Sequence, residues 1–127
     1  MQKVLGIGGV FFRAKDPEAL SSWYTDHLGI DIADAVWQQS SGPTVFCPFK
    51  HDPEYFGRRE QQWMINFRVA DLDAMVSQLQ SRGIDVEMRP DEWDSEVGRF
   101  ARVYDPEGNP IELWEPAPHS ALGNHTV

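Results

Sequence analysis

The chain has 127 residues, which is enough for one hydrophobic core but not for separate cofactor and substrate domains. Its net charge of −9 argues against nucleic-acid binding, and its single cysteine, Cys47, excludes an internal disulfide and a thiolate zinc site. No apolar run approaches the roughly 18 residues of a membrane span, and no signal-like segment opens the chain, so we expect a cytoplasmic protein without a membrane partner.

The first half of the chain predicts a strand, a helix and two further strands. Residues 6–14 have the two alternating faces of a strand. Asp16 offers an N-cap oxygen to the helix, Pro17 suits its first position, and Gly29 supplies the left-handed residue that ends it. The predicted elements of this half are strands over residues 6–14, 30–37 and 44–49 and a helix over residues 17–28.

The second half predicts the same order of elements after a charged linker over residues 50–62. Asp71 caps the second helix and Gly83 ends it, and residues 105–109 form a turn between the last two strands. The predicted elements of this half are strands over residues 63–69, 84–88, 99–104 and 110–114 and a helix over residues 72–82. We expect residues 117–127 to be a mobile tail.

The two halves also have related sequences. Residues 12–20 and 28–32 are echoed by residues 67–75 and 82–86. Similarity at a fixed offset, here about 55 positions, indicates repeated supersecondary units that bury a shared core. Two units form a closed object only by pairing with each other or with a second chain, so we expect the ligand site between them.

Two motifs carry a family resemblance. Residues 16–29 read Asp-Pro-(x)6-Tyr-(x)3-Leu-Gly, and residues 105–113 read Asp-Pro-Glu-Gly-Asn-(x)2-Glu-Leu. With the order of the elements, these motifs resemble the vicinal oxygen chelate superfamily over roughly residues 5–116. That superfamily includes glyoxalase I, extradiol dioxygenases, fosfomycin resistance enzymes and bleomycin resistance proteins.

The resemblance implies an α+β fold in which two paired βαβββ modules form a curved mixed sheet around a cleft. Such clefts are commonly completed by dimerisation, so we expect a homodimer. We expect one domain over residues 1–116, with the first module over about residues 1–57 and the second over about residues 58–116.

The resemblance also implies a divalent metal, held by a His on the first strand and a Glu on the last strand of each half. The matching His positions are Gly9 and Met64, and the matching Glu positions are Glu112 and a site near Phe46 or Cys47. Only Glu112 keeps the family's ligand. Because such sites normally use three protein ligands, we expect neither a metal nor another cofactor.

Strand alternation predicts which side chains face the cleft. The opposite faces are more apolar and should pack beneath the helices. They carry Val10, Phe12, Ile65, Phe67, Val69, Ile111 and Leu113. The alternative interpretation of Trp114 is a position in the core. The alternative interpretation of Arg13 and Arg68 is that they are exposed at strand ends or pair with neighbouring acidic residues. The candidate catalytic residue is Glu112, and the candidate ligand contacts are Phe11, Arg13, Trp63, Met64, Asn66, Arg68, Arg102 and Trp114.

Three functions are compatible with this sequence. The first is a bleomycin-resistance-like binding protein whose metal-free cleft takes an aromatic or planar small molecule, and the loss of donors at Gly9 and Met64 favours it. The second is a glyoxalase-like lyase or isomerase, or a dioxygenase-type enzyme, that uses Glu112 as a base or metal ligand. The third is a dimerisation or regulatory unit without small-molecule chemistry.

Overall fold

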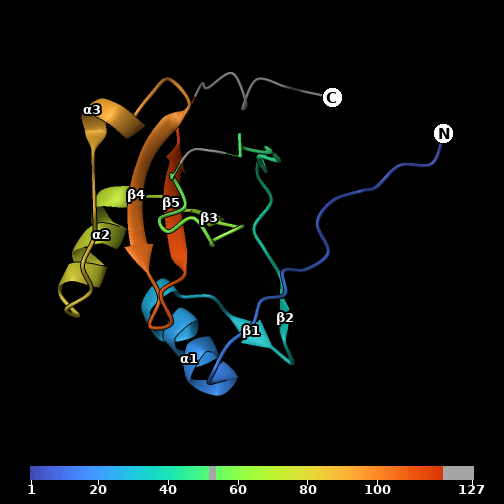
Figure 1. Cartoon of the computed structure of the whole chain (residues 1–127), viewed down its shortest axis with the longest axis horizontal. Coiled ribbons are helices and arrows are strands. Elements are labelled where there is room, and N and C mark those ends of the chain that lie inside the picture. The colour runs from blue at the N-terminus through green and yellow to red at the C-terminus, as the bar shows by residue number, and fades with distance from the viewer. Residues whose placement is uncertain (52–53, 119–127) are drawn as a thin grey trace.

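The computed structural model describes residues 1–51 and 54–118 as a mixed α/β chain (Figure 1). β5 lies between β3 and β4 in a mixed sheet, parallel to β3 and antiparallel to β4, while β1 and β2 form a separate hairpin. The predicted tail falls outside the described residues from residue 119 onward. The elements are α1 (Pro17–Leu28), β1 (Ile32–Ala33), β2 (Val36–Trp37), β3 (Ile65–Arg68), α2 (Leu72–Gln80), α3 (Pro90–Trp93), β4 (Gly98–Tyr104) and β5 (Pro110–Pro116).

The two long helices begin at the predicted caps. The Asp16 carboxylate accepts the backbone N–H of Ala19 at 3.1 Å, and Gly29 ends α1 with a left-handed φ of 71°. Asp71 caps α2 in the same way. α2 ends at Gln80, earlier than predicted, because the chain there tightens into a turn of i to i+3 hydrogen bonds. Within the described residues, no helix has the length and apolar character needed to cross a membrane.

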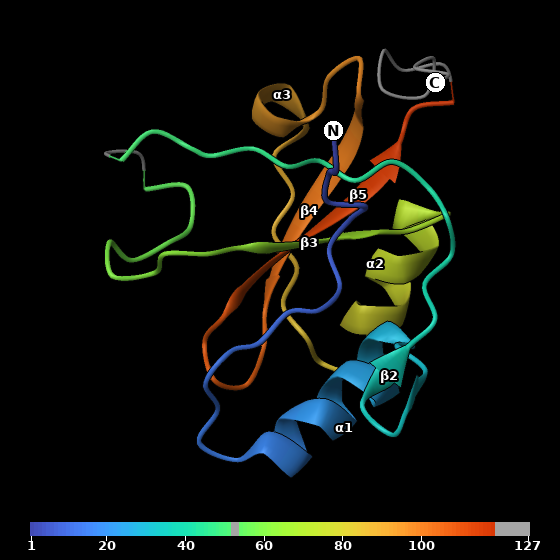
Figure 2. The same cartoon turned by 90° about the vertical axis from the view of Figure 1, so that its right-hand side faces the viewer.

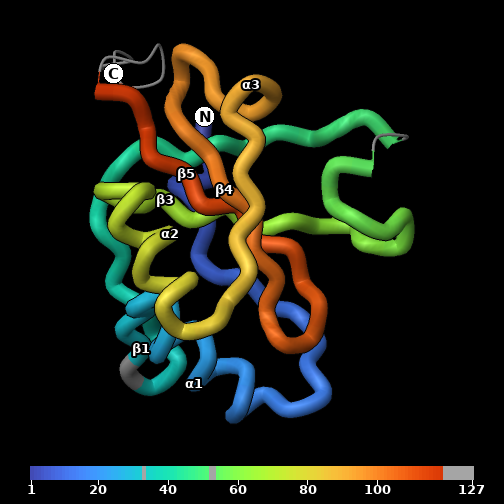
Figure 3. The backbone as a smooth tube through the Cα atoms, turned by 90° about the vertical axis from the view of Figure 1, so that its left-hand side faces the viewer, coloured from blue at the N-terminus to red at the C-terminus, as the bar shows by residue number. Residues whose placement is uncertain are grey.

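The second half forms most of its predicted sheet. β3, β4 and β5 match three of its four predicted strands, although their ends differ by a few residues. The segment over residues 84–88 runs alongside β4 (Figure 3) but contributes only one bridge, between Glu87 and Arg102. Pairing stops there because Pro90 has no N–H to donate and starts the short helix α3 instead.

The first half differs from its prediction. Residues 6–14 and 44–49 form no strand, and residues 30–37 form a hairpin whose turn lies at Asp34 and Ala35, both with positive φ. Figure 2 shows the two unpaired segments crossing in front of the sheet, on the side away from α2. Alternation marks a segment as a possible strand, but a ladder also needs a neighbouring edge. The described part of the first half therefore has no sheet equivalent to that of the second half.

The core lies between the sheet and the helices α1 and α2. The predicted packing of Ile111 and Leu113 beneath the helices is confirmed, and Phe67 packs against the same core. Val10 and Phe12, which were predicted to join them, are instead 58% and 48% exposed. The buried core comprises Leu20, Tyr24, Ile30, Leu72, Val76, Leu79, Ala101, Val103, Ile111 and Leu113.

One buried carboxylate joins α1 to the turn between β4 and β5. Asp105 is only 4% exposed, and its Oδ2 accepts hydrogen bonds from the Tyr24 hydroxyl at 2.7 Å and from the Asn109 side chain at 2.8 Å. Its Oδ1 accepts the backbone N–H groups of Glu107 and Asn109. The two sequence motifs therefore meet at a single hydrogen-bonded centre.

The buried Tyr24 phenol makes this centre sensitive to alkaline pH. Burial raises the pKa of Tyr24 far above its usual range, and the hydrogen bond and charge of Asp105 raise it further. Because the folded-state pKa is raised, the stabilisation is complete below the ordinary tyrosine pKa of about 10. It is lost as the pH rises from that value through the folded-state pKa.

We predict that Tyr24→Phe lowers the free energy of unfolding by about 1–2 kcal/mol at pH 7, because the ring is kept and only the buried hydrogen bond is lost. Urea denaturation measures this difference, which should shrink above pH 10 as the unfolded wild-type tyrosine ionises. The matched control is Tyr104→Phe, because Tyr104 is 46% exposed and its hydroxyl accepts a long hydrogen bond from Arg102 at 3.5 Å. Equal stability of both variants would contradict the assigned role of Tyr24.

Candidate ligand-binding site

Three polar side chains lie in a row across the sheet, on the face opposite the core. The register pairs Glu112 of β5 with Asn66 of β3 on one side and with Arg102 of β4 on the other. Successive side chains of a strand point to opposite faces, and the neighbours of Glu112, Ile111 and Leu113, are in the core. The structure thus brings together three of the predicted site residues, which we call the polar row.

The Glu112 carboxylate has a hydrogen-bond donor on each oxygen. Asn66 Nδ2 donates to Oε1 at 2.8 Å. The hydroxyl of Tyr55, from the chain between β2 and β3, donates to Oε2. Glu112 and Tyr55 are both half-buried, so these bonds replace part of the hydration that the carboxylate loses.

The guanidinium of Arg102 lies over two aromatic rings that contact each other edge to face. Its central carbon is 4.7 Å from the ring centroid of Tyr55 and 5.5 Å from that of Trp93, within the range of cation–π attraction. Nη2 donates to the Tyr55 carbonyl at 2.6 Å and contacts the Met64 sulfur at 3.5 Å. Arg102 is only 6% exposed, and its Nε has no hydrogen-bond acceptor among the described residues.

The Tyr55 phenol is held in its protonated form. Burial raises the pKa of Tyr55 above its usual range, and the hydrogen bond and charge of Glu112 raise it further, while the positive charge of Arg102 lowers it. The raising effects dominate. The phenol therefore acts as the donor to the carboxylate at neutral pH.

The residues at the family's metal positions do not fit a chelated divalent ion. Gly9 has no donor atom, the Met64 sulfur contacts a guanidinium, and both Glu112 oxygens already accept hydrogen bonds. A cation beside Met64 would also be repelled by Arg102. In residues 1–51 and 54–118, no group of three or more His, Cys, Asp or Glu side chains is placed to hold a metal.

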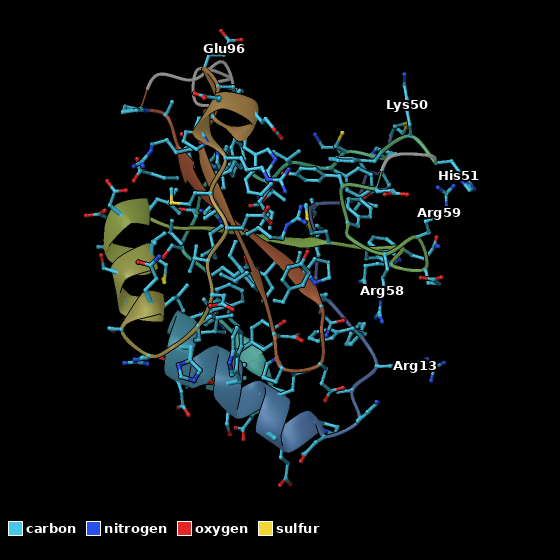
Figure 4. The ribbon with its side chains drawn as sticks, turned by 60° about the vertical axis from the view of Figure 1, so that its left-hand side comes forward. Arg13, Lys50, His51, Arg58, Arg59 and Glu96 are labelled. Atoms are coloured by element: carbon cyan, nitrogen blue, oxygen red, sulfur yellow. The ribbon has the colours of Figure 1, made fainter. Side chains whose placement is uncertain are left out.

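Three predicted site residues lie outside the polar row. Phe11 is 97% exposed and Trp63 is 79% exposed. Arg13 is also exposed, and Figure 4 shows it pointing away from the sheet. All three come from segments that are not part of the sheet in the described residues.

The other two predicted site residues, Arg68 and Trp114, lie next to the polar row and form hydrogen bonds with other parts of the chain. Arg68 Nη2 donates to the carbonyl of Ser40 at 3.0 Å. Trp114 is 3% exposed, stacks on Phe100 with a ring separation of 6.3 Å, and donates its indole N–H to the Val97 carbonyl at 3.0 Å. Trp114 therefore supports the sheet from a buried position.

Sequence reasoning did not include Tyr55 or Trp93 in the site. Tyr55 belongs to the segment predicted as a linker, where the only local signal is an aromatic pair with Phe56 among charged residues. Trp93 is the last residue of the helical turn α3 and lies in an acidic segment over residues 91–96. Pro90 was the available signal for that turn, because proline suits the first position of a helix.

Cavities elsewhere on the surface do not include the polar row. One cavity of about 260 Å³ is lined by Trp23, Ile84 and Tyr104, among others. Another of about 360 Å³ lies along α1 and is lined in part by Ser22 and Asp26. Neither of these two cavities is lined by a residue of the polar row, in which Arg102 is 6% exposed and Glu112 is half-buried.

Comparisons with known proteins show the family of this chain. A family model described as the Glyoxalase/Bleomycin resistance protein/Dioxygenase superfamily matches residues 6–113. Among solved structures, the chain is similar to TnmS3, an antibiotic binding protein from Streptomyces sp. CB03234, with 24% sequence identity and a TM-score of 0.51 over 81% of this chain and 88% of that one. This likeness shows the fold alone, and no curated protein matches significantly. The family match spans both halves and both motifs, and the chain therefore belongs to the glyoxalase, bleomycin resistance protein and dioxygenase superfamily.

Proposed function

We propose that this protein binds a planar aromatic small molecule at the polar row, without a metal. The proposal rests on the position of Arg102, whose guanidinium lies over the rings of both Tyr55 and Trp93. A flat cation among aromatic faces also attracts the ring of a ligand. Glu112 and Asn66 lie beside it and supply the few convergent polar groups that orient a ligand.

The first half supplies the remaining contacts when it closes over this face. Phe11 and Trp63 offer exposed aromatic rings, and Arg13 offers a free cation. Met64 already lines the row with a polarisable sulfur. In this arrangement Arg68 and Trp114 fix neighbouring chain segments through their own hydrogen bonds.

A homodimer completes the cleft in this proposal. β3 is at the edge of its sheet in the described residues, with unpaired backbone groups along one side. Ile7, Val10 and Phe11 of the first half and Val45 and Phe46 farther along are all more than half exposed, which is costly for an isolated chain. Pairing the two predicted modules, within a chain or between two copies, covers both features and encloses the polar row as one domain over residues 1–116.

A binding function is compatible with the structural neighbour, which shares the fold. TnmS3 is an antibiotic binding protein, so this fold binds a small molecule in that case. We extend only the type of function to the present chain. The cytoplasmic location remains a proposal from the sequence alone. A lyase, isomerase or dioxygenase activity is the competing proposal and requires turnover that depends on Glu112.

We predict that planar aromatics such as 2-naphthol quench the tryptophan fluorescence of the protein, and that Arg102→Leu weakens their binding about 10-fold or more. Arg99→Leu is the matched control, since Arg99 lies on the same strand but pairs with Asp73 at 2.9 Å. It should bind like the wild type. Similar affinities of the two variants would contradict the assigned site, and conversion of a bound compound into product, abolished by Glu112→Gln, would favour the enzyme.

We also predict that the protein sediments as a dimer at micromolar concentration and that Phe11→Glu shifts it to the monomer, because the exposed apolar side chain becomes charged. Sedimentation velocity measures this directly. Ser77→Glu introduces the same charge at an exposed position of α2 and should leave the dimer intact. A wild-type monomer, or a dimer insensitive to Phe11→Glu, would contradict the proposed closure.

A further inference from the structure

We propose that Glu112, Arg102 and Trp93 form a phenol-binding site, that Tyr55 occupies this site in the free protein, and that a hydroxylated planar aromatic ligand displaces it. This inference rests on the proposed binding function and deepens it by naming the class of ligand. It also assigns Tyr55 the role of an internal competitor.

The contacts of Tyr55 are those expected of a bound phenol. Its hydroxyl donates to Glu112, and the guanidinium of Arg102 lies over its ring at 4.7 Å. The ring of Trp93 meets it edge-on at 6.1 Å, and Phe49 lies against it at 5.8 Å. The Glu112 carboxylate therefore accepts a hydrogen bond from the Tyr55 hydroxyl, while one cation and two aromatic rings contact the Tyr55 ring.

The Tyr55 carbonyl holds Arg102 through its hydrogen bond at 2.6 Å, but the Tyr55 ring is not part of the framework of the site. It is half-buried and comes from the segment between β2 and β3, and the buried core draws on no described residue of that segment. Tyr24, by contrast, is 5% exposed and belongs to the core. The Tyr55 ring can therefore leave without dismantling the sheet that carries Glu112 and Arg102.

The carboxylate selects for a hydroxyl on the displacing ligand. Asn66 already donates to Oε1 of Glu112, so Oε2 loses its donor when Tyr55 leaves. A half-buried carboxylate oxygen without a donor is unfavourable. A neutral phenol restores the lost hydrogen bond, a ring without a hydroxyl does not, and a phenolate would be repelled by Glu112.

The test removes the Tyr55 side chain by mutation and adds a small molecule of the same chemical structure in solution. Tyr55→Ala deletes a side chain that p-cresol reproduces, and toluene is the same molecule without the hydroxyl. We expect p-cresol to bind Tyr55→Ala about 10-fold or more tightly than toluene by calorimetry, and Glu112→Leu in the same background to abolish this preference. Phe56→Ala removes a neighbouring ring of the same segment and should not create a p-cresol site.

The variant Tyr55→Phe provides a second test that does not depend on the folding of Tyr55→Ala. Tyr55→Phe keeps the ring but loses the bond to Glu112, so 2-naphthol should bind it several-fold more tightly than the wild type. Equal binding of p-cresol and toluene, or equal affinity of 2-naphthol for wild type and Tyr55→Phe, would overturn the inference but leave planar-ligand binding at Arg102 in place. Failure of every aromatic probe on every variant would overturn the proposed function as well.

Discussion

The geometry of the polar row depends on the buried carboxylate of Asp105, which is not a member of the row. Asp105 accepts four hydrogen bonds in a buried position, from the Tyr24 hydroxyl and from groups of the turn between β4 and β5. That turn sets the register in which Arg102 faces Glu112. A slip of one residue would move Glu112 to the helix-covered face. The bond to Tyr24 then docks α1 on the same turn, so one centre fixes both the core and the orientation of the polar row.

The sheet separates two chemical environments as a consequence. Its helix-covered face is apolar, with Val103, Ile111 and Leu113 fully buried. Its other face carries a carboxylate held by Tyr55 and Asn66 beside a guanidinium that lies over the rings of Tyr55 and Trp93. Burying Arg102 against aromatic faces leaves a surface suited to flat molecules. The same groups leave little room for a chelated metal, because both Glu112 oxygens are already engaged.

The sequence predicts local features of this fold better than distant ones. The cap at Asp16 and the end of α1 at Gly29 depend on neighbouring residues, and alternation places Glu112 on the face away from the core. The contact of Tyr55 with Glu112 spans 57 positions of sequence, and no periodic pattern connects them. Residues 6–14 have the pattern of a strand, but the pattern does not specify which edge, in which copy of the chain, pairs with them.

We propose that the polar row binds a planar hydroxylated aromatic without a metal. The most direct test is a crystal structure of the protein grown with 2-naphthol. We expect the naphthol ring to lie against Arg102, its hydroxyl to bind Glu112, and Tyr55 to have moved out of the row. Tyr55 still in place with naphthol bound elsewhere, or a metal ion coordinated by Glu112, would contradict this proposal.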